Sequence, residues 1–409
     1  MNHKNEHLNS IVQLMDVLSN ITVYGKALAK VLLIVLLICP AVTAYDGRAV
    51  QYYNEGVDLS EIGRYAVEAV TSYDKALAIN PDDAITWNLR GIALGELGRF
   101  RDAIASFDKA IAINPNDAIT WSNRGYALYI LGRHTEAVES YDKAIAIDPD
   151  DAITWTLRGN SLVKLGQYTD AIASYDRAIA INPDDARVWN LRGIALRDAG
   201  RYTDAVASYD KAIDIDPDDD FTWTLRGNSL VKLGRYTDAI ASYDRAIAIN
   251  PDYTDAWNLR GIALGEFGGY TDAIASYDKA IASNPNYADA WYNRGIALGE
   301  LGRYTDAVAS YDKAIASNPN YADAWNNRGV VLGELGRHTE AVDSYDKAIA
   351  INPDDAKVKH NRKTALQKQT KTTPVLYAPA GAVVLMAGIA VWSRRRDPHL
   401  NKFISGKVS

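Results

Sequence analysis

The polar and apolar residues between positions 49 and 355 follow a helical pattern that repeats along the chain. In one block, apolar residues recur three or four positions apart over residues 87–97 and again over residues 103–113. This spacing predicts two amphipathic helices. Gly98 lies between the two runs, and Pro115 ends the block because proline cannot continue a helix. The pattern therefore predicts an all-α fold built from pairs of helices.

Two residue types mark the period of this pattern, which is 34 residues. They are prolines at positions 81, 115, 149, 183, 217, 251, 285, 319 and 353, and tryptophans at positions 87, 121, 155, 189, 223, 257, 291 and 325. A fixed period of this length indicates stacked repeats. Eight repeats begin near the tryptophans, and a divergent one lies in front of them, with Tyr52 in the place of Trp. We expect nine repeats over residues 49–355, stacked as an α-solenoid because each helix pair needs its neighbours to bury its apolar face.

Several positions within a repeat have a predictable local role. Gly91 is expected to let the two helices approach closely, which must offset its cost of about 0.5–1 kcal/mol in a helix. Asp102 lies in the first turn of the second helix, where the helix dipole favours an anion, and Asp117 can cap the next first helix. A run of Ser, an aromatic residue, Asp, a basic residue and Ala recurs in every repeat and indicates a stacking requirement. We interpret its Asp–basic pair as a solvated face of little energetic value.

The block from Trp87 to Pro115 resembles the tetratricopeptide repeat. Residues that fill the signature positions of that family are Trp87, Gly91, Leu94, Gly98, Ala103, Phe107, Ala110 and Pro115. Arg90 stands where the family usually has leucine. The resemblance implies a right-handed superhelix whose first helices line a concave, peptide-binding groove. Some members clamp a C-terminal carboxylate with Lys one position after Trp and Asn five after it. This chain has no Lys at the first position and Asn only at Asn160 and Asn228, so an adaptor of that kind is not expected.

Variation among the repeats concentrates on the first helices, which makes them the candidate binding surface. Two positions before Trp and nine after it, the last three repeats carry the acidic residues Asp255, Asp289, Asp323, Glu266, Glu300 and Glu334. This acidic ladder would suit a basic partner, although the aspartates could instead stabilise helix N-termini. The other candidates form a mixed aromatic, amide and basic surface suited to extended peptide, or ordinary solvent-facing surface. They are Tyr126, Tyr129, Asn160, Lys164, Asn190, Asn228, Lys232 and Tyr292.

The sequence offers little catalytic or metal-binding chemistry. Cys39 is the single cysteine, which excludes an intrachain disulfide and a thiolate metal cluster. The six histidines are scattered, and neither a Ser/His/Asp set nor a phosphate-binding glycine loop is present. Residues 214–220 resemble the start of a calcium loop but lack its glycine and final glutamate, so we interpret them as an acidic turn. We expect no enzyme activity, cofactor or metal.

Charge argues against a nucleic-acid partner. Residues 45–354 contain 30 Lys and Arg against 47 Asp and Glu, a balance of −17. Binding to nucleic acid depends on neutralising phosphates with basic side chains, which this acidic region opposes. Hydrophobic residues at 48% and charged residues at 23% are ordinary values for a folded protein.

Two apolar segments flank the repeats. Residues 31–44 are preceded by two lysines and predict a signal peptide cleaved after Ala44, or alternatively an uncleaved anchor. This segment ends the N-terminal region 1–44, whose true start is Met1 or Met15. Residues 374–392 are 19 uncharged residues, or about 28 Å of helix, enough to span a bilayer. Three arginines follow at once and favour a cytoplasmic tail over residues 393–409. Residues 356–373 are predicted to form a capping helix and linker.

Together these features predict a single-pass cell-membrane protein of a prokaryotic, including archaeal, type. Its repeats would lie outside the cytoplasm, where they would act as a non-enzymatic scaffold that holds peptides or proteins in the groove. Two other functions stay open: an extracytoplasmic subunit that recruits a catalytic partner, and a cytosolic adaptor. The sequence names no particular partner.

Overall fold

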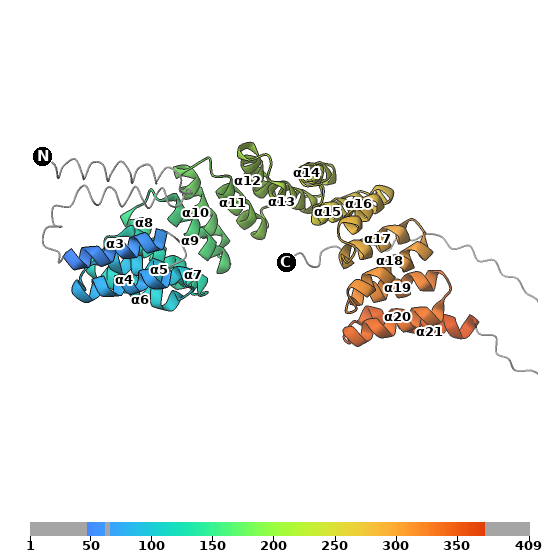
Figure 1. The fold of residues 1–409 in the computed structure, drawn as a ribbon. Coiled ribbons are helices and arrows are strands. Elements are labelled where there is room, and N and C mark those ends of the chain that lie inside the picture. Colours follow the sequence, from blue (N-terminus) through green and yellow to red (C-terminus); the bar gives the residue numbers. More distant parts are fainter. Residues whose placement is uncertain (1–46, 62–65, 373–409) are drawn as a thin grey trace, which may run out of the picture. The chain divides into compact units, whose positions relative to one another are not determined.

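The computed structural model describes residues 47–61 and 66–372 and shows an all-α protein. Within these residues there are 19 helices, which follow one another in chain order (Figure 1). The chain divides into two compact parts, an N-terminal part that ends at Pro319 and a C-terminal part that begins at Asn320. The N-terminal part is a stack of helix pairs, and the C-terminal part is one pair followed by a single helix, so the predicted α-solenoid is confirmed. Its right-handed sense stays a prediction.

The helices alternate between first and second members of a repeat. In the N-terminal part the first helices are α3 (Gly47–Glu61), α5 (Ala84–Glu96), α7 (Ala118–Ile130), α9 (Ala152–Lys164), α11 (Ala186–Asp198), α13 (Asp220–Lys232), α15 (Thr254–Glu266) and α17 (Ala288–Glu300). The second helices are α4 (Ala66–Ile79), α6 (Phe100–Ile113), α8 (His134–Ile147), α10 (Tyr168–Ile181), α12 (Tyr202–Ile215), α14 (Tyr236–Ile249), α16 (Tyr270–Ser283) and α18 (Tyr304–Ser317). The C-terminal part contains α19 (Ala322–Glu334), α20 (His338–Ile351) and α21 (Ala356–Thr372).

Local signals set the helix ends. Both helices of the block begin three residues earlier than the apolar pattern predicts. Asp83 caps α5 by accepting the N–H of Ile85, whereas α6 begins after Arg99 without a side-chain cap. The predicted capping role of Asp117 is confirmed, since its side chain accepts the N–H of Ile119. Gly98 has a φ of +71° and ends the first helix, where the Arg99 N–H donates to the carbonyl of residue 94 at 2.9 Å. Glycine adopts this left-handed conformation at no steric cost.

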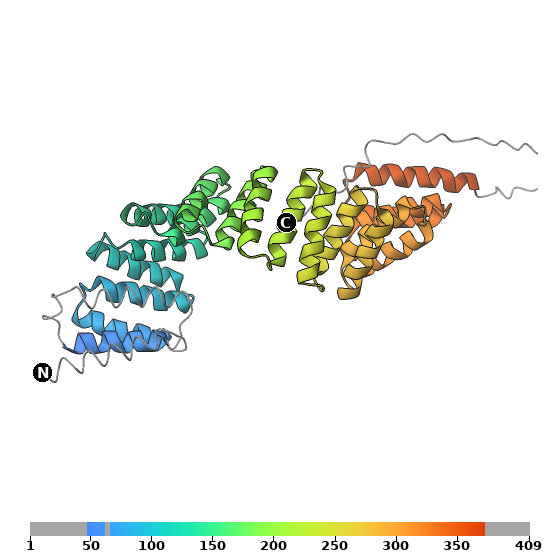
Figure 2. The same cartoon turned by 90° about the horizontal axis from the view of Figure 1, so that it is seen from above.

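The first helices form the inner row of each part. Every helix of the N-terminal part contacts the next one along the chain, and consecutive first helices, such as α15 and α17, also contact each other. No two consecutive second helices do so among the described residues. The first helices of the N-terminal part therefore lie in one row, which we call the inner row; its stacking is seen from above in Figure 2.

The predicted close approach at Gly91 is confirmed. A Cβ atom at Gly91 would lie 2.4 Å from Cε1 of Phe107 on the second helix of the same repeat. Other repeats place a tyrosine ring in the same way, for example Tyr209 against Gly193. Tyr209 is fully buried. The ring therefore packs directly on helix backbone, and this contact joins the two helices of a repeat.

An arginine bridges three helices at seven repeat boundaries of the N-terminal part. Arg192 on α11 donates from Nε to Oδ1 of Asp176 on α10, and from Nη1 to Oγ of Ser208 on α12, both at 2.6 Å. Its guanidinium also lies 5.9 Å from the ring centre of Trp189. The aspartate is the constant Asp of the Ser–aromatic–Asp–basic–Ala run; its side chain is 51% exposed, as a solvated face requires, and it also bonds to the next repeat. Both bonds recur at Arg90, Arg124, Arg158, Arg192, Arg226, Arg260 and Arg294.

Several predictions for the flanking segments fall outside the described residues. These are the signal peptide or anchor before residue 45, the membrane segment at 374–392 and the tail at 393–409. Among the residues that the structure describes, no helix combines the length and the apolar character that a bilayer crossing requires.

Candidate functional site

Each first helix ends in a residue that varies among the repeats and is mostly exposed to solvent. We call the residues nine positions after each Trp the groove column; in the N-terminal part they are Glu96, Ile130, Lys164, Asp198, Lys232, Glu266 and Glu300. All are exposed except Glu266, which is half-buried. The character of the column changes from mixed to acidic toward α17. The predicted candidates Lys164 and Lys232 thus lie on the inner row and are open to solvent.

The two predicted glutamates of the N-terminal part gather around tyrosines. Glu266 ends α15, Glu300 ends α17, and Tyr270 begins the intervening α16. Burial raises the pKa of Tyr270, and both carboxylates raise it further. The Tyr236 hydroxyl donates to Glu266, whose pKa is nevertheless raised because partial burial penalises its charge. We call Glu266, Glu300, Tyr236 and Tyr270 the acidic patch. It presents two carboxylates with phenol groups between and beside them.

The predicted aspartates have a different placement from the glutamates. Asp255 and Asp289 lie in the first turns of α15 and α17, as the helix-terminus explanation requires. Asp255 also accepts a hydrogen bond of 2.8 Å from the hydroxyl of Tyr287, the residue that precedes α17. Burial, and then the bond to Asp255, raise the pKa of Tyr287. Asp255 therefore contributes to the joint between two repeats, while Asp289 remains exposed.

Four of the predicted groove residues belong to the packing of the array. Asn160 and Asn228 accept hydrogen bonds of 2.8 Å from the buried hydroxyls of the tyrosines at positions 175 and 243. Asn190 donates to the carboxylate at position 219 at 3.2 Å and to the hydroxyl of Thr222. Tyr292 is only 8% exposed. Because these side chains hold helices together, we leave them out of the proposed binding surface.

Two aromatic candidates lie on α7. Tyr126 is 47% exposed. Tyr129 is half-buried, and its ring centre lies 5.2 Å from that of His134 at the start of α8. Tyr126 is thus available to a partner, and Tyr129 is partly available.

The C-terminal part contains the last two candidates. Asp323 lies in the first turn of α19, and Glu334 ends that helix; both are exposed. Burial, together with Glu334, raises the pKa of Tyr345 to about 12. Within this part the two acids lie at opposite ends of one helix, so they present two separate charges.

The variable position two residues before Trp also carries exposed apolar residues near the starts of four first helices, which the sequence did not single out as binding candidates. Two positions before Trp lie Ile85, Ile119, Ile153 and Phe221, which are 45%, 39%, 54% and 50% exposed. Large apolar residues rarely form open rows on a monomer surface without a binding role. The signal was in the sequence, since the residues at this position vary among the repeats.

The acidic turn near residue 217 is explained by capping. Asp219 accepts the N–H of Phe221 and caps α13, and Asp216 accepts the N–H of Asp218. In the two described ranges, no group of three or more His, Cys, Asp or Glu is arranged to hold a metal ion.

Family models match most of the repeat region. Models described as "Tetratricopeptide repeat" match residues 88–152, 156–220 and 292–356 and, separately, 208–241, and a "TPR repeat" model matches 227–268 and 266–302. The chain belongs to the tetratricopeptide repeat family. A comparison with curated proteins found no match.

Solved structures of this family are similar to the chain. The C-terminal part of a TPR repeat-containing protein from Cytophaga hutchinsonii has 18% identity and a TM-score of 0.50, with 58% of this chain and 97% of that chain covered. A tetratricopeptide repeat protein from Parabacteroides merdae has 18% identity and a TM-score of 0.47, over 61% and 98%. YrrB, described as a TPR protein with an unusual peptide-binding site, has 25% identity and a TM-score of 0.40, over 46% and 97%. The first likeness supports the fold.

Proposed function

We propose that the protein is a membrane-anchored, non-enzymatic scaffold that holds peptide or protein partners along its first helices. The observation that carries this proposal is the division between constant and variable residues. Most constant residues are buried or bridge helices, whereas the variable residues two positions before and nine positions after each Trp are mostly exposed on the inner row. An array whose scaffold is uniform and whose inner surface varies is built to recognise something along its length.

The inner row of the N-terminal part indicates the chemistry of the partner. It offers exposed apolar residues on α5, α7 and α9 and the acidic patch at α15 and α17. Neighbouring helix axes lie about 8–10 Å apart, which is about three residues of extended chain. We therefore expect a partner segment with apolar residues about three apart, followed by basic residues that meet the acidic patch.

Reversing the charge at the acidic end should weaken binding. We expect Asp289→Lys combined with Glu300→Lys to reduce the affinity of the full-length protein for a basic peptide about tenfold at low salt, because attraction becomes repulsion. The difference should shrink at high salt, since exposed charges are screened over about 10 Å at 0.1 M. Fluorescence anisotropy measures the affinity, and circular dichroism checks that helicity is unchanged.

The matched control carries the same charge change on second helices. Glu68→Lys with Glu139→Lys alters exposed residues of α4 and α8, outside the inner row, and should leave the affinity unchanged. Equal affinity of all three proteins would return Asp289 and Glu300 to a purely structural role. Capture of one stoichiometric enzyme by the full-length protein would favour the subunit that recruits a catalytic partner.

The membrane topology is tested separately. We expect the full-length protein to stay in the membrane fraction after alkaline carbonate extraction, and external protease to remove the repeats from intact cells. N-terminal sequencing should find Tyr45 as the first residue of the mature protein if the signal peptide is cleaved after Ala44. Repeats that resist protease while other surface proteins are digested would support the cytosolic adaptor instead.

A further inference from the structure

The last helix continues the array as if it began a tenth repeat. Val358 of α21 is only 4% exposed. Asn361 donates from Nδ2 to Oδ1 of Asn326 at 3.1 Å, the same bond that Asn residues make between earlier neighbouring repeats. Arg362 pairs with Asp346 of α20, as the bridging arginines pair with the preceding second helix. The inner contacts of α21 are therefore those of a first helix.

The outer face of α21 departs from this pattern at two positions. Lys359 stands 34 residues after Trp325, and Lys363 stands 34 residues after the packing glycine Gly329. At Gly329 a Cβ atom would already lie 2.7 Å from the ring of Tyr345. A lysine side chain at the equivalent place leaves no room for such a ring. The outer face of α21 therefore cannot accept a second helix of the usual type.

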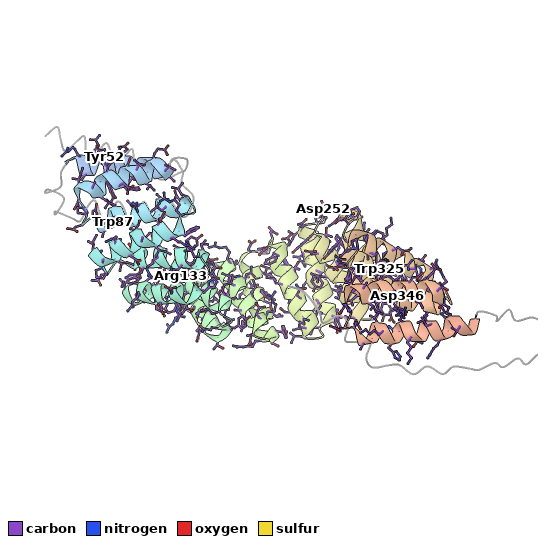
Figure 3. The ribbon with its side chains drawn as sticks, turned by 90° about the horizontal axis from the view of Figure 1, so that it is seen from below. Tyr52, Trp87, Arg133, Asp252, Trp325 and Asp346 are labelled. Atoms are coloured by element: carbon purple, nitrogen blue, oxygen red, sulfur yellow. The ribbon has the colours of Figure 1, made fainter. Side chains whose placement is uncertain are left out.

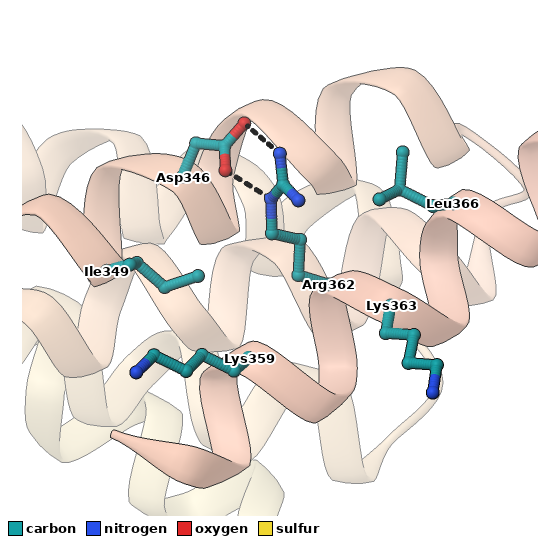
Figure 4. A pocket seen from close by; sticks show the side chains of 6 residues that line it. All are labelled: Asp346, Ile349, Lys359, Arg362, Lys363 and Leu366. Atoms are coloured by element: carbon teal, nitrogen blue, oxygen red, sulfur yellow. Dashed lines mark hydrogen bonds and ion pairs between the residues drawn. The ribbon is translucent and has the colours of Figure 1, made fainter. Parts of the chain in front are cut away.

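This outer face forms a shallow cationic cavity with α20. The cavity has a volume of about 330 Å³ and is lined by Asp346, Ile349, Lys359, Arg362, Lys363 and Leu366 (Figure 4). Arg362 and Asp346 neutralise each other through two hydrogen bonds. Lys359 and Lys363, four residues apart on one face of the helix, remain as two exposed cations beside two apolar side chains. An anion with an attached apolar group fits this combination.

The surrounding charge and the course of the chain indicate the source of that anion. Helix α21 carries six Lys and Arg and no acidic residue, in contrast to the acidic array. It ends at Thr372, two residues before the apolar segment 374–392. Two residues span at most about 7 Å, so a membrane-inserted segment brings the end of α21 to the headgroup region.

We propose that the face of α21 formed by Lys359 and Lys363 docks on anionic lipid, with lipid phosphates bound by the two lysines. The proposal rests on the membrane insertion of residues 374–392 given under Proposed function. Thirteen residues separate Lys359 from Thr372, which is about 20 Å of helix, so docking requires α21 to lie along the membrane surface. The anchor would then hold the last repeat at a fixed angle to the membrane.

Lysine reactivity tests the docking directly. Full-length protein is reconstituted in lipid nanodiscs of neutral phosphatidylcholine or of a mixture with anionic phosphatidylglycerol. A water-soluble amine-acylating reagent is added, and mass spectrometry measures the acylation rate of each lysine. We expect Lys359 and Lys363 to react about fivefold more slowly in anionic discs, the factor that corresponds to headgroup attraction for one lysine. High salt should abolish the difference.

Internal and variant controls complete the test. Lys279 and Lys313, exposed on second helices of the N-terminal part, should react equally in both kinds of disc. Lys368, which lies on the same helix, should also react more slowly in anionic discs. Lys359→Glu with Lys363→Glu should abolish this difference at Lys368, whereas Lys279→Glu with Lys313→Glu should not. Equal rates for Lys359 and Lys363 in both discs, in protein that resists carbonate extraction, would overturn the docking and assign the pair to an acidic protein segment. Protein released by carbonate would instead contradict the anchoring itself.

Discussion

We expect Arg192→Met to lower the free energy of local opening around α10, α11 and α12 by about 1.5–3 kcal/mol, the range for charge-assisted hydrogen bonds in partly buried places. The substitution removes the hydrogen bonds to Asp176 and Ser208 and the contact of the guanidinium with the Trp189 ring. Ser208 is fully buried and keeps only its bond to the carbonyl at position 204. The Asp176 side chain is 51% exposed, so water replaces part of the loss.

Native-state hydrogen exchange measures this effect, because a repeat array need not unfold as one cooperative unit. Arg201→Met is the matched control: Arg201 also pairs with an aspartate, Asp204, but the two side chains are 54% and 49% exposed. It should cost less than about 1 kcal/mol, as exposed ion pairs do. Equal effects of the two substitutions would show that the bridge between three helices adds nothing. Amides in distant repeats should be unaffected, since repeats interact only with neighbours.

The same Gly→Ala change should have opposite signs at two positions of α5. Gly91→Ala forces a Cβ atom against the ring of Phe107, a residue that is only 3% exposed. Overpacking costs about 1–3 kcal/mol. Gly95→Ala meets nothing closer than a Phe100 carbon at 3.9 Å, so the better helix propensity of alanine should stabilise by up to about 1 kcal/mol.

Thermal and urea unfolding of the two glycine variants, together with exchange of amides in α5 and α6, distinguish these outcomes. A double variant that also carries Phe107→Leu should recover part of the loss at Gly91, because a smaller side chain relieves the contact. The double-mutant cycle isolates that coupling. Stabilisation by Gly91→Ala would mean that the helices separate without cost and that the ring does not fix their spacing.

The helix pairs, their caps and their turns could be predicted from sequence because each depends on residues close together in the chain. Asp117, Gly98 and Gly91 have roles that a short window reveals. The predicted helices began three residues too late because the apolar pattern was counted from Trp87 and Ala103, one turn after α5 and α6 begin.

The binding surface could be predicted only in part. The sequence located the variable residues on the first helices, and the structure leaves Tyr126, Lys164 and Glu300 exposed there. The sequence alone could not distinguish exposed amide side chains from amide side chains that accept a hydrogen bond from a buried hydroxyl. Asn160 bonds to a tyrosine 15 residues away on another helix, and the partner of Asp255 lies 32 residues away. Such partners depend on how helices are placed side by side.

The sequence by itself determined the period, the helix pairs and the acidic balance of the repeats, because these follow from local spacing and composition. The tertiary structure decided which of the charged residues shared by all repeats form hydrogen bonds between helices. Arg192 meets residues 16 positions before and 16 after it only when three helices pack together. Packing also decided that Lys359 and Lys363 close the outer face of α21, since a glycine position matters only where a neighbouring ring must fit. Figure 3 labels two of the tryptophans that mark the repeats, Trp87 and Trp325, and the aspartate Asp346 that pairs with Arg362.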